Sequence, residues 1–262
     1  MDEVGGADEV GGAIRAEFTH QAEAFARASV YQHAATLEAL LLALAPAPGQ
    51  AWLDVACGPG IVSRALAGRV GAVVGVDLTP AMVAKARAEA AGLPGLRFVE
   101  GDAAALPFPD AAFDGAVTRF SLHHIPAPAR VVREMARVVR PGGTVAVADH
   151  LTSADARTAA WHHDIERLRD PSHWLSLAPE AFFGLGGEVG GPGGPLEVVH
   201  RETRAYDIDF EEWLTRGSGG PAQRALITRL LAEAPPEGAR IFGLADGRIR
   251  MELGIAVWRR RP

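Results

Sequence analysis

Short apolar runs without polar alternation recur along the first 150 residues, and segments with helical spacing separate them. Five runs predict buried strands, at 51–56, 72–76, 96–100, 113–118 and 144–148. Three helices are expected between them, at 61–67, at 80–91 after the Thr79-Pro80 start signal, and at about 131–139. Strands that are apolar on both faces and alternate with helices are typical of a parallel sheet covered on both sides. The pattern therefore predicts an α/β fold.

The N-terminal part has a different pattern. Residues 1–13 contain a direct repeat, DEVGGA followed by DEVGGA, which predicts a flexible tail because it is glycine-rich and lacks apolar periodicity. Apolar residues at helical spacing then run from Ile14 to Leu44 and end at a proline- and glycine-containing break. Residues 14–262 are expected to form one domain.

The strand–helix alternation changes after Asp149. A helical insertion is expected at about 152–186, and a glycine- and proline-rich loop follows it. The remaining elements are predicted as a strand at 196–203, helices at 209–216 and 221–233, and a final strand at 253–258. The last strand is expected to follow a hairpin turn at Asp246-Gly247.

Composition and charge exclude several classes of protein. Lys and Arg number 26 against 32 acidic residues, so a net charge of -6 argues against nucleic acid as a partner. The single cysteine, Cys57, cannot form an intrachain disulfide, which favours a reducing compartment. No apolar run approaches a membrane span, and the N-terminus lacks the layout of a signal peptide. We therefore expect a cytoplasmic monomer or homodimer without a membrane partner.

The candidate chemistry starts at the turn Ala56-Cys57-Gly58-Pro59-Gly60, directly after the first strand. Small residues there let a ligand approach the main-chain N–H groups closely. The second strand ends in Asp77, whose carboxylate can accept hydrogen bonds from both hydroxyls of a ribose. A glycine turn with a strand-end acid indicates a nucleoside site.

A nicotinamide dinucleotide is one candidate ligand, but two residues disfavour it. The dinucleotide fingerprint G-x-G-x-x-G needs a third glycine, and Ser63 stands in that position. Asp54 lies beside the turn, where its charge would repel a pyrophosphate but suits an ammonium group.

From about Phe18 to Asp149, the chain resembles the class I S-adenosylmethionine-dependent methyltransferases, and within them the small-molecule branch similar to ubiquinone and menaquinone biosynthesis enzymes. Four segments carry the resemblance in the expected order: Leu53–Gly60, Val74–Met82, Gly101–Ala103 with Leu106-Pro107-Phe108, and Arg140–Gly143 before the fifth strand. The chain departs from many relatives at Ala56, where they have glycine. The resemblance implies a Rossmann-like, seven-stranded, mostly parallel sheet with an antiparallel last strand and helical lid elements.

The resemblance also implies a role for each site residue toward S-adenosylmethionine. On the methionine side, main chain around Ala56, Gly58 and Gly60 would face the ligand, and Asp54 would lie near its ammonium group. The carbonyl of Arg119 would accept from the same ammonium.

On the nucleoside side, Asp77 would bind the ribose and Leu78 would contact the adenine. Asp102 would accept from the adenine amino group, and the Ala103 N–H would meet the ring. Phe25 belongs to a stretch, beginning at Phe18, that is similar to the family's covering helix.

Histidines and aromatic residues are the candidates for the acceptor side. His123 follows the fourth strand and is a candidate general base, although methyl transfer from a sulfonium can rely mainly on positioning. Adjacent histidines on a helix point about 100° apart, so no metal site is expected at His162-His163. The insertion is expected to act as a lid and acceptor wall through four aromatic residues, Trp161, Trp174, Phe182 and Phe183.

The predicted function is transfer of a methyl group from S-adenosylmethionine to O, N or C of a small-molecule acceptor. A protein that holds the cofactor without catalysis is the alternative from a different class. An NAD(P)-dependent oxidoreductase is the enzymatic alternative, and Asp54 and Ser63 argue against it.

Overall fold

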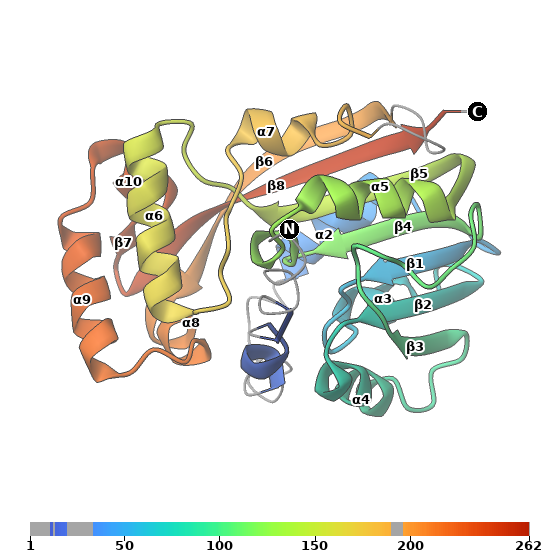
Figure 1. Ribbon diagram of the computed structural model, residues 1–262, viewed down its shortest axis with the longest axis horizontal. Coiled ribbons are helices and arrows are strands. Elements are labelled where there is room, and N and C mark those ends of the chain that lie inside the picture. The colour runs from blue at the N-terminus through green and yellow to red at the C-terminus, as the bar shows by residue number, and fades with distance from the viewer. Residues whose placement is uncertain (1–10, 13, 20–33, 190–195, 262) are drawn as a thin grey trace, which may run out of the picture.

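The computed structural model describes residues 11–12, 14–19, 34–189 and 196–261. A single sheet runs through the molecule, with helices on both faces (Figure 1). Its strands are β1 (Ala51–Val55), β2 (Ala72–Asp77), β3 (Leu96–Glu100), β4 (Phe113–Arg119), β5 (Val139–His150), β6 (Leu196–Asp209), β7 (Leu244–Ala245) and β8 (Arg248–Arg260).

The strand order is β3-β2-β1-β4-β5-β8-β6, and β7 pairs with β8. Strands β1 to β5 are parallel, whereas β8 runs antiparallel to β5, β6 and β7. This confirms the predicted mostly parallel sheet with antiparallel C-terminal pairing. The described residues contain eight strands instead of seven, because the two-residue strand β7 forms the first arm of the last hairpin.

Helices cover the sheet on both sides. Their bounds are α2 (Ala34–Leu44), α3 (Ile61–Leu66), α4 (Pro80–Glu89), η1 (Leu122–His124), α5 (Pro128–Val138), α6 (Ala156–Arg169), α7 (Pro179–Gly184), α8 (Phe210–Arg216), α9 (Pro221–Ala232) and α10 (Pro236–Ile241). One face packs on α5 and α7, and the other on α2, α3 and the group α6, α8 and α10. In Figure 1, α6, α8, α9 and α10 gather at the end of the sheet formed by β6, β7 and β8.

The central strands are apolar at successive positions because both faces are covered. In β5, Val145 and Val147 are fully buried against α5, whereas Ala146 and Ala148 are fully buried in the cluster on the opposite face. Successive side chains of a strand point to opposite faces, so each layer takes every second residue. This is the physical reason for the runs without polar alternation.

The structure differs from the predicted elements mainly in the C-terminal half. The insertion contains two helices, α6 and α7, with a non-helical stretch at 170–178 between them. Strand β6 continues to Asp209 because it pairs with β8 along its length, and α10 was not predicted. The hairpin turn is confirmed, since Asp246 and Gly247 have φ of +51° and +71°, as a type I′ turn requires.

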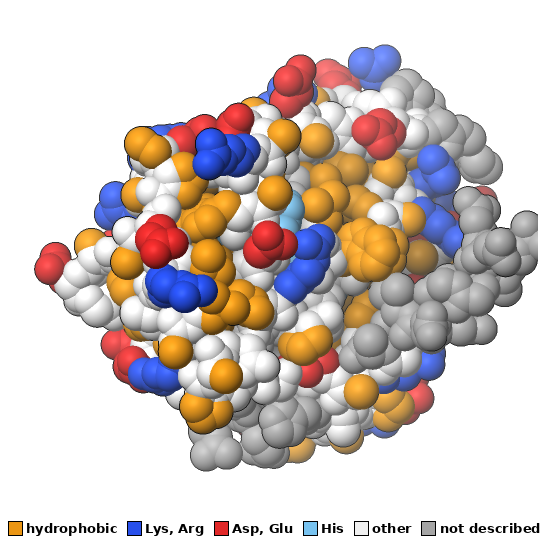
Figure 2. Space-filling model, turned by 60° about the vertical axis from the view of Figure 1, so that its left-hand side comes forward, with side chains coloured by type: hydrophobic (Ala, Val, Ile, Leu, Met, Phe, Trp, Pro, Cys, Tyr) orange, Lys and Arg blue, Asp and Glu red, His pale blue; other side chains and the backbone are white. Residues whose placement is uncertain are grey.

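The predicted N-terminal tail lies mostly outside the described residues. Residues 11–12 are helical in the structure, and so are residues 14–19. No helix in the described part of the chain has the length and apolarity needed to cross a bilayer. Figure 2, which brings the α6 end of the molecule forward, shows basic and acidic side chains scattered among hydrophobic ones on the described part of that face.

Candidate active site

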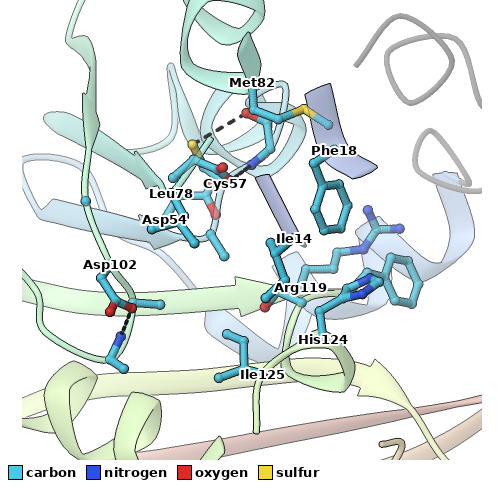
Figure 3. A pocket seen from close by; sticks show the side chains of 18 of the residues that line it. Ile14, Phe18, Asp54, Cys57, Leu78, Met82, Asp102, Arg119, His124 and Ile125 are labelled. Carbon is cyan, nitrogen blue, oxygen red and sulfur yellow. Dashed lines mark hydrogen bonds between the residues drawn. The ribbon is translucent and has the colours of Figure 1, made fainter. Parts of the chain in front are cut away.

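A pocket opens at the carboxyl ends of the parallel strands, where the predicted site residues also lie (Figure 3). Loops after β1, β2, β3 and β4 form its walls, and residues from the N-terminal segment cover it. Ligands of open α/β sheets bind at this edge, next to the point where the strand order reverses. Here the order reverses between β1 and β4. Eight of the predicted site residues line the pocket: Asp54, Ala56, Gly58, Asp77, Leu78, Asp102, Ala103 and Arg119. Gly60 and His123 are not among the described residues that line it.

The turn after β1 uses left-handed backbone at three positions. Ala56, Gly58 and Gly60 have φ of +52°, +51° and +78°. Gly60 lies under the turn, where an added Cβ would come within 3.0 Å of the Phe98 ring, so a side chain there would displace the ring. Alanine in the left-handed region costs about 1 kcal/mol or more relative to glycine. The departure at Ala56 therefore costs stability, while its side chain stays small enough for the pocket.

Asp54 connects the first strand to the first helix of the site. Its Oδ2 accepts hydrogen bonds from the Ser63 N–H, at 2.8 Å, and from the Ser63 hydroxyl, at 2.6 Å. Burial raises the pKa of Asp54 to about 7, and the bonds from Ser63 only partly offset this. Serine at the third position of the glycine fingerprint thus has a structural reason, since it holds the carboxylate that faces the pocket.

Asp77 organises the pocket wall between the turn after β1 and α4. Its carboxylate accepts from the Gly58 N–H at 2.8 Å and from the Thr79 N–H at 2.9 Å, so it joins the turn after β1 to the start of α4. Burial raises the pKa of Asp77 above its ordinary value, against these N–H donors. Leu78 follows on the pocket wall and is half-buried.

The turn after β3 contributes Asp102 and Ala103. The Asp102 Oδ1 accepts from the Ala104 N–H at 2.8 Å, which orders a turn, and Ala103 is buried beside it. In Figure 3, Asp102 lies across the pocket from Phe18.

Arg119 and the N-terminal segment form the opposite side. The Arg119 guanidinium donates to the Thr36 hydroxyl at 2.9 Å and lies 4.4 Å from the Phe120 ring centre. Ile14 and Phe18 line the pocket from above, and Phe18 packs against Met82. Phe25 falls outside the described residues.

The turn after β4 is held by one buried carboxylate. Phe120 has φ of +55°, a costly conformation for a bulky residue, and it turns the chain into η1. The Asp149 Oδ2 accepts the three successive N–H groups of residues 121–123, at 3.2, 2.6 and 3.2 Å. Its Oδ1 accepts from His123 Nδ1 at 2.6 Å and from the His150 N–H at 2.7 Å. Asp149 therefore determines the position of the loop after β4, which lines the pocket.

The structure corrects the placement of His123. His123 is 4% exposed, its Nδ1 is bound to Asp149, and it is absent from the residues that line the pocket in the described chain. Its neighbour His124 lines the pocket instead, with ring centres 4.1 Å apart. A one-residue difference decides which imidazole faces the cavity, because η1 turns successive side chains in different directions.

Sequence reasoning missed the cluster to which these histidines belong. Six histidines gather beside the pocket within ring-to-ring distances of 4.1–5.9 Å: His123, His124, His150, His162, His163 and His173. They come from η1, β5, α6 and the 170–178 loop, so no spacing in the sequence links them. His123, Asp149 and His150 offer ligand atoms close together, but both Asp149 oxygens already accept hydrogen bonds. We assign this group to holding the loop.

The four insertion aromatics do not form the predicted acceptor wall, since none lines the pocket among the described residues. Phe182 is 1% exposed and packs in the core with Leu151 and Trp258. Trp161 contacts Phe242 and donates to the Leu230 carbonyl at 3.1 Å. Trp174 is 45% exposed. Phe183 packs beside Phe182. The insertion anchors helices to the sheet, because these residues point into the core or to the outer surface.

The buried His123–Asp149 pair makes stability depend on pH. Burial alone would lower the pKa of His123, but the Asp149 carboxylate raises it above 6.5. Burial alone would raise the pKa of Asp149, but His123 and the hydrogen bonds lower it below 3.8. The pair therefore makes its full contribution to stability between pH 3.8 and pH 6.5. It is lost as pH rises through the folded pKa of His123 and as pH falls through that of Asp149.

Asp149→Asn should lower the free energy of unfolding by about 3–5 kcal/mol at pH 6, because it leaves a buried His123 without its charged partner. The deficit should shrink as pH rises through the folded pKa of His123, because the histidine then becomes neutral in the wild type as well. Urea unfolding of both proteins at several pH values measures this. A deficit that does not change with pH would show that the pair is not ionised in the folded protein.

Comparisons with known proteins agree with this geometry. A family model described as a methyltransferase domain matches residues 53–147, from β1 into β5. An uncharacterized methyltransferase of Bacillus subtilis, YcgJ, is 33% identical over 187 residues, which cover 68% of this chain and 70% of the relative. The crystal structure of YcgJ superposes with a TM-score of 0.80 at 25% identity and covers 88% of this chain and 100% of that one.

A second relative points toward the predicted branch. The demethylmenaquinone methyltransferase of Desulfitobacterium hafniense is 40% identical over 108 residues, which cover 39% of this chain and 43% of the relative. The match thus spans less than half of either chain. The chain matches YcgJ in both sequence and structure, and its sheet and the loops at the carboxyl edge agree with that match. The chain therefore belongs to the methyltransferase family.

Proposed function

We propose that this methyltransferase takes its methyl group from S-adenosylmethionine and transfers it to O, N or C of a small molecule. One observation carries the choice of donor: the carboxylates of Asp54, Asp77 and Asp102 face the same pocket as the left-handed turn after β1. Such a site attracts a ligand with positive charge and free hydroxyls and repels a pyrophosphate. S-adenosylmethionine carries an ammonium, a sulfonium and a ribose diol.

Each wall of the pocket then has a role toward the donor. Asp77 accepts from the ribose hydroxyls, Leu78 contacts the adenine, and Asp102 with the Ala103 N–H binds the adenine edge. The main chain of Ala56, Gly58 and Gly60 faces the methionine part. Asp54 and the Arg119 carbonyl lie near the ammonium. When bound, the donor supplies an electrophilic methyl group, which the loop after β4 presents to the acceptor by orientation.

A small-molecule acceptor is supported by two observations. The Desulfitobacterium hafniense relative is named a demethylmenaquinone methyltransferase. The acceptor end of the pocket is formed by apolar residues, including Ile14, Phe18 and Ile125, around the His124 imidazole. An apolar pocket with few polar groups is typical of small-molecule sites.

Calorimetry tests the choice of donor directly. S-adenosylmethionine and S-adenosylhomocysteine should bind at one site, whereas NAD and NADP should give no heat, because two acidic side chains face the turn where a pyrophosphate would lie. NAD binding at comparable affinity would reject the methyltransferase assignment of the pocket. Incubating the protein with methyl-labelled donor and a metabolite panel, followed by mass spectrometry, separates catalysis from holding the cofactor.

A further inference from the structure

His124 occupies the acceptor end of the pocket. It lies on the wall with Ile125 and Arg119, and Figure 3 places it below Phe18. Its ring meets the Phe18 ring edge to face, with centres 4.8 Å apart. The imidazole is thus held from both sides, by Phe18 on one and by His123 on the other, at 4.1 Å between ring centres. A side chain held this way has one orientation toward a ligand.

The hydrogen bonds of His124 Nδ1 determine its tautomer. Nδ1 lies 3.2 Å from the Ser172 carbonyl oxygen and 3.0 Å from the Ser172 Oγ. A carbonyl only accepts, and the Ser172 hydroxyl already donates to Asp170 Oδ1 at 2.6 Å. Nδ1 must therefore carry the hydrogen, and in a neutral ring Nε2 then keeps its lone pair.

Nε2 of His124 is the atom left for a ligand. Nε2 makes no hydrogen bond with the described residues. It is also not one of the fully buried polar atoms that lack a partner among those residues. The atom is therefore not fully buried, and it belongs to a residue that lines the pocket. An imidazole with a fixed Nδ1–H and an open Nε2 lone pair is arranged to accept a proton.

Burial keeps this imidazole neutral. The ionisable groups that face it are His123 on η1, Asp149 on β5, Asp170 and His173 on the loop after α6, and Arg119 on β4. Burial first, and then the charge of His123, lower the pKa of His124 to about 4, against the attraction of Asp170. Asp170 stays ionised, because His124, Arg169 and Ser172 outweigh its burial and hold its pKa at about 2.

We propose that His124 is the catalytic proton acceptor for methyl transfer to an O–H group, with Ser172 and Asp170 as positioning residues. The inference rests on the proposed function. A lone pair of the acceptor atom forms the new bond to the methyl carbon while the carbon–sulfur bond breaks and its electron pair stays on sulfur. The acceptor's proton goes to His124 Nε2. The sulfonium becomes a neutral thioether, and His124 releases the proton, which carries the positive charge, to solvent.

A weakly basic imidazole suits this order of events. Once the bond to the methyl carbon forms, the proton on the positively charged oxygen becomes far more acidic than it was in the free hydroxyl group. A base with a low pKa can take such a proton and returns it to solvent readily at neutral pH. The fixed Nδ1–H matters more than basicity, because it keeps the lone pair aimed into the pocket.

The tautomer can be measured without an acceptor. Two-bond proton–nitrogen correlation on the full chain labelled at histidine nitrogens, with bound S-adenosylhomocysteine, should show one histidine with protonated Nδ1 and bare Nε2 that disappears in His124→Gln. Ser172→Ala should keep Nδ1 protonated, because the main-chain carbonyl of residue 172 still accepts from it, but the signal should shift with the loss of the Oγ contact. A protonated Nε2 at pH 7.5 in the wild type would overturn the proposal, whatever the activity of the protein.

Kinetics test the role itself, with a panel of phenols and hydroquinones as acceptors. His200→Gln is the matched control, since His200 lies on β6 and is partly exposed. His124→Gln should lower kcat by about 100-fold or more, while affinity for S-adenosylhomocysteine changes less than threefold. The low-pH decline of the wild-type rate should vanish in that variant, and His200→Gln should keep the full rate. Equal rates for wild type and His124→Gln would reject His124 and leave the proposed function standing. Absence of cofactor binding in the wild type would reject the proposed function. The nitrogen correlation measurement would still show which nitrogen of His124 carries the hydrogen.

Discussion

Asp77→Ala should weaken S-adenosylhomocysteine binding by about 30- to 1,000-fold, the largest effect on the cofactor that we expect from one substitution. Two charge-assisted hydrogen bonds to the ribose are together worth about 2–4 kcal/mol. The substitution also leaves the N–H groups of Gly58 and Thr79 without their acceptor, so the turn that faces the donor loses its support. Calorimetric titration of both proteins measures the change.

Asp164→Ala is the matched control, because that carboxylate is 71% exposed on α6 and far from the loops of the pocket. It should bind as the wild type does. Asp77→Asn should lie between the two, since its amide retains one acceptor oxygen for the main chain. If Asp77→Ala folds and binds S-adenosylhomocysteine with unchanged affinity, the nucleoside lies elsewhere.

Phe182→Ala should lower the free energy of unfolding by about 3–5 kcal/mol, since truncating a buried aromatic removes its burial and leaves a cavity. Its ring lies in the core cluster under α7, and Gly254 on β8 has no side chain because a Cβ there would come within 2.7 Å of the ring. Denaturant unfolding measures the loss. Affinity for S-adenosylhomocysteine should be unchanged in the protein that stays folded, because Phe182 does not line the pocket.

Trp174→Ala provides the comparison from the same insertion. Its ring is 45% exposed, so its truncation should change the free energy of unfolding by less than about 1 kcal/mol. If Phe182→Ala instead left stability intact and abolished acceptor turnover, the aromatic-wall hypothesis would be restored. The pair therefore separates a core role from an acceptor role.

The elements that could be predicted from the sequence are those with a local signal. Five strands of the parallel part agree with their apolar runs to within a few residues, apart from the longer β5, because strands buried on both faces are apolar throughout. Asp246-Gly247 predicted the last hairpin, because a type I′ turn needs these residue types. Asp54, Asp77 and Asp102 lie at the ends of consecutive elements, so their approach to one pocket follows from parallel topology alone.

Other features depended on the tertiary structure. The choice between His123 and His124 depends on how η1 turns after Phe120, and Asp149, 26 residues away from His123, holds that turn. The partner of His124, Ser172, is 48 residues away in the chain. Neither separation is periodic, so no pattern in the sequence reveals these contacts.

The sequence by itself thus determined the strand–helix order, the glycine turn after the first strand and the acids at the strand ends, since each depends on local backbone preference or on parallel topology. Only the tertiary structure decided which imidazole faces the pocket, that six histidines form one cluster, and that the insertion aromatics pack away from the pocket. The physical reason is that side chains on η1, β5, α6 and the 170–178 loop become neighbours only when the chain closes over the sheet. Their contacts are then selected by burial and charge, which act in space and not along the chain.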